Sequence, residues 1–203
     1  MVKRYLLRTP LREDDIRKLR VGDIVYLSGK VFTLRDRGAK KLLELLSSGA
    51  RPPVDLGGAA VYHAGPLVRR CGGSWEVISA GPTTSTRMER YDPELIARGV
   101  RAIIGKGRLL EGTREACRKH GAAYMVYPGG CGALAAKSIK KVVSVCWLEL
   151  GVPEAIWILE VEDFGPLYVA IDSEGRDLYL ERKESVNIAR EKILEELRNK
   201  GFS

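Results

Sequence analysis

Apolar residues along the chain follow two patterns, short continuous runs and longer stretches in which they recur every three or four positions. The short runs predict β-strands, and the recurring spacing predicts amphipathic helices. Strands are expected at residues 59–63, 67–68, 75–79, 101–104, 123–127, 142–147, 155–161, 167–171 and 177–180. Helices are expected at residues 36–48, 92–98, 113–120 and 133–140. Because strands and helices alternate along the chain, the pattern predicts an α/β fold with a mixed sheet and flanking helices.

Residue types at the ends of these runs add detail. The Ser-Gly-Lys sequence at residues 28–30 separates the apolar runs 23–27 and 31–33, which predicts a hairpin. Asp36 and Asp92 each stand at the start of a helical stretch, where an aspartate side chain accepts hydrogen bonds from free amide groups. Both are therefore expected to cap the helices that follow them.

The C-terminal part predicts an amphipathic helix at about residues 185–200. Ala189, Ile193 and Leu197 share one face of it. No stretch of linker composition divides the chain, so residues 1–203 are expected to form a single domain.

Charge and composition narrow the classes of function. The chain has 203 residues, of which 45% are hydrophobic and 30% charged, and a formal net charge of +8. This composition is typical of a globular protein. The positive surplus suits a polyanion, an anionic small substrate or an acidic partner protein, and does not choose among them.

Membrane and secretory segments are not expected. The most apolar stretch, residues 142–161, is interrupted by Glu149, Pro153, Glu154 and Glu160, so no transmembrane span is expected. No signal-like segment is visible, and the four cysteines show no metal-ligand spacing. We therefore expect a soluble, cytoplasmic protein with free thiols.

Three loops carry candidate chemistry. Residues 81–88 read Gly-Pro-Thr-Thr-Ser-Thr-Arg-Met and offer hydroxyls and a guanidinium to a carboxylate or phosphate, although a capping loop would use the same residues. Residues 105–107 read Gly-Lys-Gly and place a cation beside flexible backbone, although an ordinary turn has the same composition. Residues 34–37, Leu-Arg-Asp-Arg, are either a strand-end site or a surface charge cluster.

The remaining candidates favour structural roles. His63 lies in an apolar strand, which favours a core histidine whose hydrogen bonds are satisfied, and His120 has no partner motif. Cys131 lies in a glycine-rich turn before a helix, with no histidine near it in sequence, so a packing role is favoured over a nucleophile.

The order of the motifs is more specific than any one of them. The segments are SGKVFTLRD, DLGGAAVYHAGP, AGPTTSTRMERYDPELIARGVRAIIGKG, YPGGCGALAAKSIKKVV and WLELGVPEAIWILEVEDFGP with IDSEGRDLY. In this order they resemble the β subunit of class I iron–sulfur fumarate hydratases and the related L-tartrate dehydratases, over about residues 21–179. The resemblance implies a swivelling β/β/α domain, here in the separate-chain form.

The resemblance also assigns roles to individual residues. Thr83, the first threonine of GPTT, would be the catalytic base, and Thr84 and Arg87 would bind a substrate carboxylate. Arg35 and Lys106 would be further carboxylate ligands. The family's [4Fe-4S] cluster is bound by cysteines of the partner α subunit, so the resemblance implies a cofactor in the partner and no metal ligand in this chain.

Two positions depart from the family pattern. Ala39 stands where the family usually has a histidine, and Gly165 is an extra residue in the motif that typically reads EDFP. The first could alter substrate preference or a hydrogen bond near Arg35, and the second should only change a turn.

These observations leave ranked hypotheses. The first is the β subunit of a fumarate hydratase, which forms a hetero-oligomer with a fumarase α subunit and acts on a dicarboxylate substrate. The second keeps the chemistry and changes the substrate to L-tartrate or another hydroxy-dicarboxylate. The third is a basic binding module for RNA, which is disfavoured because aromatic residues make up only 7% of the chain and are not interleaved with Lys and Arg. We therefore expect neither nucleic acid nor a membrane as a partner.

Overall fold

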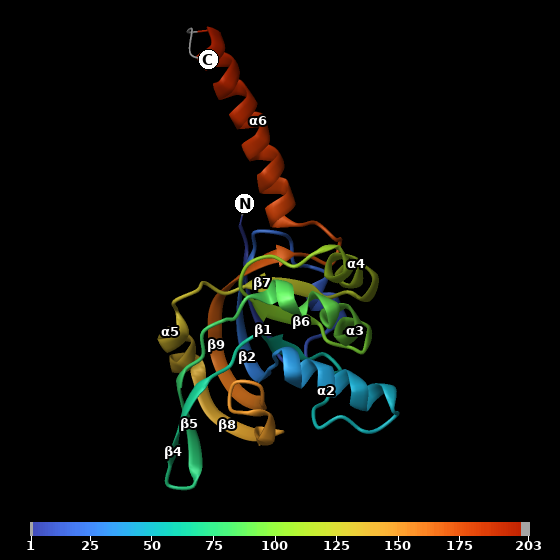
Figure 1. Cartoon of the computed structure of the whole chain (residues 1–203), viewed down its shortest axis with the longest axis vertical. Coiled ribbons are helices and arrows are strands. Elements are labelled where there is room, and N and C mark those ends of the chain that lie inside the picture. The colour runs from blue at the N-terminus through green and yellow to red at the C-terminus, as the bar shows by residue number, and fades with distance from the viewer. Residues whose placement is uncertain (1, 200–203) are drawn as a thin grey trace.

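The computed structural model describes residues 2–199 and has a mixed sheet flanked by helices, which confirms the predicted fold class (Figure 1). The strands are β1 (Arg4–Arg8), β2 (Ile24–Thr33), β3 (Ala60–Tyr62), β4 (Leu67–Cys71), β5 (Ser74–Ser79), β6 (Ala102–Gly105), β7 (Ala123–Val126), β8 (Ile139–Cys146) and β9 (Ile156–Ile171). The helices are α1 (Glu13–Ile16), α2 (Asp36–Ser47), α3 (Asp92–Ala97), α4 (Glu111–His120), α5 (Gly132–Ser138) and α6 (Leu178–Asn199), with short 3-10 helices η1 (Ser85–Arg90) and η2 (Leu148–Leu150).

The main sheet closes on itself. Its strand order is β1-β2-β3-β6-β7-β9-β8, and β2 also pairs with β9. Strands β2, β3, β6 and β7 are parallel neighbours, and the long β9 runs antiparallel to both β7 and β2. These pairings join β2, β3, β6, β7 and β9 into a ring.

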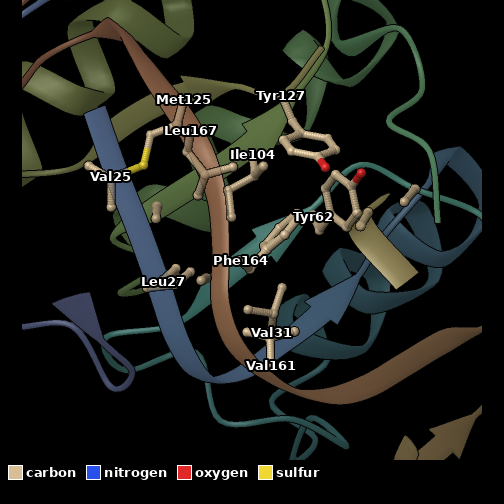
Figure 2. Close-up of a cluster of buried hydrophobic side chains, with 14 of the residues drawn as sticks. Val25, Leu27, Val31, Tyr62, Ile104, Met125, Tyr127, Val161, Phe164 and Leu167 are labelled. Carbon is tan, nitrogen blue, oxygen red and sulfur yellow. The ribbon is translucent and has the colours of Figure 1, made fainter. Parts of the chain in front are cut away.

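Alternate residues of the ring strands face two different cores. Ala60 and Tyr62 of β3 pack in the interior of the ring, whereas Val61 between them packs outside. The interior cluster includes Phe164, whose ring centroid lies 5.1 Å from that of Tyr62 (Figure 2). On the outside, helices α2, α3 and α4 supply the apolar partners, including Leu42. Because both faces of these strands are buried, they read as continuous apolar runs.

A second, two-stranded sheet stands apart from the ring. Strands β4 and β5 form an antiparallel hairpin that packs on α5 and β8 and extends away from the ring (Figure 1). Trp75 of this hairpin meets the buried Trp157 of β9 edge to face, with ring centroids 5.2 Å apart. The aromatic pair therefore anchors the hairpin to the main sheet.

The predicted hairpin around residues 28–30 is wrong, because residues 24–33 form the single strand β2. Gly29 has a φ of +99°, and the pairing of β2 with β9 shifts register twice between Val25 and Gly29, so the strand bends here instead of reversing. In the same way, the expected strands 155–161 and 167–171 are one strand, β9. Each long strand follows the curvature of the ring.

The C-terminal helix begins earlier than predicted. The carboxylate of Asp177 accepts hydrogen bonds from the backbone N–H of Tyr179 and Leu180, at 2.7 and 3.3 Å, and so caps α6. The expected strand at 177–180 is therefore wrong. Helix α6 projects away from the sheet, and none of its described residues is buried (Figure 1). The expected helix end at residue 200 lies outside the described residues.

The two predicted aspartate caps are also wrong. Arg35 occupies the cap position of α2, and the carboxylate of Asp36 lies 3.7 Å from Arg87 and 3.6 Å from Arg90. Asp92 is the first residue of α3, and its carboxylate faces the ring of His63. In each case a cationic side chain or an imidazole from elsewhere in the fold attracts the carboxylate away from the helix end. Within residues 2–199, no helix is both long and apolar enough to cross a bilayer.

Candidate functional site at the ends of the parallel strands

Three of the residues singled out from the sequence follow the carboxyl ends of parallel strands. Arg35 comes after β2, His63 after β3 and Lys106 after β6. Because β2, β3 and β6 are parallel neighbours, these residues lie along one edge of the sheet. The carboxyl ends of parallel strands are where both barrels and open sheets of the α/β class bind their ligands.

The Gly-Pro-Thr-Thr loop is held between the extensions of β3 and β6. Thr83 donates its backbone N–H and its hydroxyl to the carbonyl oxygen of His63, at 2.7 and 3.0 Å. Thr84 pairs with Lys106 in a parallel bridge, and the N–H of Ser85 donates to the Lys106 carbonyl at 3.0 Å. The structure therefore brings Thr83, Thr84 and Lys106 together through their backbones.

The capping-loop interpretation accounts for part of this segment. The hydroxyl of Thr83 satisfies a backbone carbonyl, and the hydroxyl of Thr86 does the same for Arg108 at 2.8 Å. Thr84, by contrast, is exposed, as is Arg87 beyond it. The hydrogen bonds of Thr83 and Thr86 therefore fix the path of the segment, whereas the exposed Thr84 and Arg87 are available to a ligand.

The Gly-Lys-Gly turn depends on close approach at its first glycine. A Cβ on Gly105 would overlap the hydroxyl of Ser85 and lie 3.1 Å from Nδ1 of His63. Gly107 has a φ of +79°, which lets the chain turn directly after Lys106. Lys106 itself is half-buried, so its position is set by the turn on both sides.

Arg35 is oriented by a carboxylate. Its Nε lies 3.3 Å from Oε1 of Glu154, and its side chain is 22% exposed. Gly65 lets the guanidinium approach, since a Cβ there would come 2.8 Å from Nη1 of Arg35. The other oxygen of Glu154 accepts the backbone N–H of Arg37 at 2.9 Å. Glu154 thus ties the Arg35 side chain to the start of α2.

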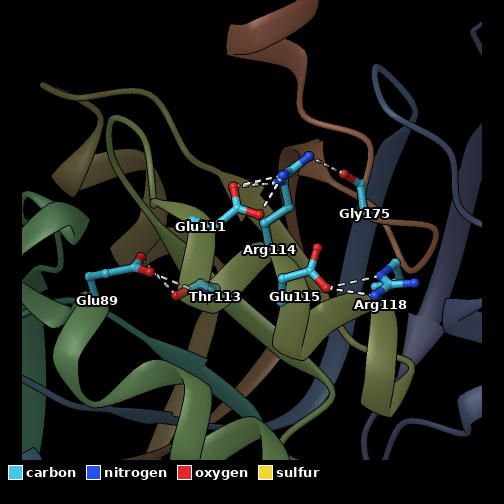
Figure 3. A network of polar contacts seen from close by, with 7 residues as sticks. All are labelled: Glu89, Glu111, Thr113, Arg114, Glu115, Arg118 and Gly175. Carbon is cyan, nitrogen blue, oxygen red and sulfur yellow. Dashed lines mark hydrogen bonds and ion pairs between the residues drawn. The ribbon is translucent and has the colours of Figure 1, made fainter.

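Arg87 is supported from two sides. The carboxylate of Asp36 faces it and Arg90, as described above. Near the end of the same 3-10 helix, Glu89 accepts hydrogen bonds from the backbone N–H and hydroxyl of Thr113, each at 2.9 Å (Figure 3). It also accepts the backbone N–H of Leu110. Glu89 thereby caps α4 from a distance and fixes η1 against it. Arg87 keeps 49% of its side chain exposed.

Sequence reasoning missed the partners of His63. Its Nδ1 lies 3.0 Å from the hydroxyl of Ser85, and its Nε2 lies 3.2 Å from Oδ1 of Asp92. His63 is therefore a core histidine with satisfied nitrogens, as predicted. Burial raises the pKa of the Asp92 carboxyl, and the neighbouring imidazole opposes that rise. No local spacing could have found this group, because its members come from the segment after β3, from η1 and from α3.

The described part of this chain does not fit an iron–sulfur cluster. Its four cysteines are all free, with Cys71 exposed on the hairpin and Cys117 buried in α4. Within residues 2–199, no group of three or more His, Cys, Asp or Glu side chains is placed to hold a metal ion. Cluster binding by the partner subunit stays a prediction.

An α/β domain whose strand ends present hydroxyls and cations along one edge is a domain suited to binding an anion. The sequence profile of the Fumarase C-terminus family matches residues 1–182. The chain belongs to this family, which confirms the resemblance found in the motifs.

Curated relatives cover the same range. The L(+)-tartrate dehydratase subunit beta of Escherichia coli (strain K12) is 43% identical over 194 residues, which is 95% of this chain and 94% of the relative. A putative L(+)-tartrate dehydratase subunit beta of Methanocaldococcus jannaschii is 46% identical over 178 residues, covering 87% and 91%. A putative fumarate hydratase class I of Geobacillus stearothermophilus is 40% identical over 181 residues, covering 88% of this chain and 34% of the relative.

Proposed function

We propose that the chain is the substrate-binding β subunit of a two-subunit hydro-lyase that interconverts malate and fumarate. The observation that carries this proposal is the sheet edge itself. One backbone-linked loop pair presents Thr83, Thr84 and Lys106, whereas Arg35 follows β2 and Arg87 lies on η1. Cations and hydroxyls of this kind suit a substrate with two carboxylates.

The residue roles follow from their chemistry. Arg35 and Arg87 bind carboxylates through the planar, two-pronged guanidinium, and Lys106 adds a point charge. Cations on the substrate's carboxylates stabilise the negative charge that develops when a proton leaves the neighbouring carbon. In this proposal the base is the Thr83 alkoxide, which forms when the hydroxyl gives its proton to solvent and which the neighbouring cations stabilise. Taking the substrate proton restores the hydroxyl that donates to the His63 carbonyl.

A partner supplies the rest of the site in this proposal. Thr84 and Arg87 are exposed, and the four cysteines belong to different parts of the fold, namely β4, α4, the turn before α5, and β8. We therefore assign the iron–sulfur cluster and the opposite wall of the site to an α subunit in the same cytoplasmic hetero-oligomer. The β chain alone should be inactive.

L-tartrate is the second candidate substrate. It is favoured by the names of the two subunit relatives that this chain matches over nearly their full length. Malate and tartrate differ by one hydroxyl, and Ala39, the family-departing position, is buried in the first turn of α2 close to Arg35.

Co-expression with the α subunit under anaerobic conditions tests the proposal. The assembled enzyme is expected to form fumarate from L-malate, followed by absorbance, and to do so more slowly and with a raised KM in Arg87→Lys. Arg118→Lys is the matched control, because Arg118 is an exposed, ion-paired arginine of α4 outside the site. Turnover of L-tartrate without malate would select the second candidate, and turnover of neither would overturn both.

A further inference from the structure

Three polar side chains are buried together directly beneath the candidate site. His63, Ser85 and Asp92, hereafter the buried trio, are fully enclosed, with no solvent exposure. The ring of His63 bridges the other two through its two nitrogens, at 3.0 Å to Ser85 and 3.2 Å to Asp92. Burying polar groups costs free energy unless they are hydrogen-bonded, so apolar side chains would have been less costly at these positions.

The buried trio is connected to both loops of the site. The backbone N–H of Lys106 donates to the Ser85 hydroxyl at 3.1 Å. The backbone carbonyl of His63 receives the N–H and the hydroxyl of Thr83. Thr83 is thus hydrogen-bonded to the main chain of His63, and Lys106 is linked to the His63 side chain through Ser85.

The hydrogen-bond directions form a consistent chain. With Asp92 ionised, its carboxylate can only accept, so Nε2 of a neutral His63 carries the hydrogen that points to Oδ1. Nδ1 then accepts from the Ser85 hydroxyl, whose oxygen accepts the backbone N–H of Lys106. The Asp92 carboxylate on α3 therefore determines that Nδ1 is the nitrogen of His63 that bonds Ser85. Ser85 in turn holds the backbone of Lys106.

We propose that His63 is a positioning residue for the hydro-lyase reaction. Asp92 orients its ring, its backbone carbonyl holds Thr83, and its side chain holds Lys106 through Ser85. This inference rests on the proposed function, since it takes Thr83 as the base and Lys106 as a carboxylate ligand. It adds residues to which the family resemblance gave no role.

Two substitutions of His63 separate positioning from packing. His63→Asn keeps a polar atom near the place of Nδ1 and can still bond Ser85, whereas His63→Leu fills the space with apolar atoms. In the assembled enzyme, His63→Leu should lower kcat/KM about 10–100-fold, because small misplacements of reacting groups are costly. His63→Asn should retain more activity than His63→Leu despite its smaller volume. Equal activity of the two, or higher activity of the leucine variant, would overturn the proposal.

Asp172→Asn is the matched control for Asp92→Asn. Asp172 is equally buried, and its carboxylate accepts backbone N–H groups, including that of Arg176 at 3.1 Å. It follows the end of β9, next to the start of β7 at the opposite edge of the sheet. Both variants should lower the melting temperature, but only Asp92→Asn should lower kcat/KM. An equal loss of kcat/KM in both variants would show that the role of Asp92 is purely structural.

Amide hydrogen exchange on the full-length isolated chain tests the same link without any enzyme assay. Ser85→Ala removes the acceptor of the Lys106 N–H, so that amide should exchange at least about 10-fold faster. The N–H of Tyr127, which bonds the Gly105 carbonyl at 2.9 Å, should be unchanged. Thr86→Ala, which removes a hydroxyl from the same loop, should leave Lys106 exchange unaltered.

The two readouts distinguish the two proposals. An assembled wild-type enzyme without hydro-lyase activity would refute the proposed function, whatever the exchange experiment shows. An active wild-type enzyme with unchanged Lys106 exchange in Ser85→Ala, or with unchanged kinetics in His63→Leu, would refute the positioning role alone.

Discussion

Replacing Gly105 by alanine would place a methyl group where the side chains beneath the site now meet. The added Cβ would overlap the Ser85 hydroxyl and lie 3.1 Å from Nδ1 of His63. Gly105 is not among the glycines with a positive φ, so its backbone conformation accepts alanine. The cost therefore comes from displaced side chains, and Ser85 is enclosed and cannot move aside freely.

The expected loss can be worked out from these contacts. Overpacking of a filled core costs about 1–3 kcal/mol. Alanine also restricts the unfolded chain, which returns about 0.4–1 kcal/mol. From the midpoints of these ranges, the net loss in the free energy of unfolding is about 1–2 kcal/mol, or about 2–8 °C in melting temperature for a chain of this size.

Thermal unfolding of the isolated chain measures this loss. Gly81→Ala is the control, because a Cβ at Gly81 would meet its nearest atom, Cα of Gly132, at an ordinary 3.6 Å. That variant should unfold within about 0.5 kcal/mol of the wild type. If Gly105→Ala melts at the same temperature as Gly81→Ala, the side chains beneath the site are not packed as described.

Three further predictions concern the site, the thiols and the isolated chain. Arg87→Lys in the assembled enzyme should raise KM and slow turnover, because lysine keeps the charge and loses the two-pronged contact; an unchanged KM would contradict this. Burial raises the pKa of the Cys117 thiol, so at pH 8 iodoacetamide should modify the exposed Cys71 while Cys117 stays unmodified until denaturant is added, as mass spectrometry would show. The isolated chain should be colourless, free of iron by metal analysis, and self-associated in ultracentrifugation because α6 exposes apolar side chains; stoichiometric iron would contradict it.

Much of the fold could be predicted because its signals are local. Buried parallel strands read as apolar runs, and helix α4 ends where predicted, at Gly121 in the left-handed conformation. The errors arose where long-range pairing decides the outcome. Residues 28–30 resemble a turn, but pairing with β9 keeps the chain extended through Gly29. Local turn residues cannot reveal a partner strand more than a hundred positions away.

The site shows the same division. The resemblance of the ordered motifs indicated Thr83, Thr84, Arg35, Arg87 and Lys106. The structure places Arg35 and Lys106 shortly after β2 and β6, and the other three in the segment between β5 and α3. Their roles stay predictions. The supporting residues could not be found in this way, because aspartate before a helix is normally read as a cap, and only the folded chain shows which imidazole or guanidinium attracts it instead.

Thr83→Ala in the assembled enzyme tests the central claim most directly. A base acts in the transition state, so its loss should lower kcat and kcat/KM together, by about 10²–10⁴-fold, with KM nearly unchanged. The measurement is the steady-state rate of fumarate formation from L-malate, with the cluster content of variant and wild type matched. The variant should assemble normally, because Thr83 also keeps its backbone hydrogen bond to His63. A near-normal kcat would contradict the assignment and would require the proton to be taken by a group on the partner chain.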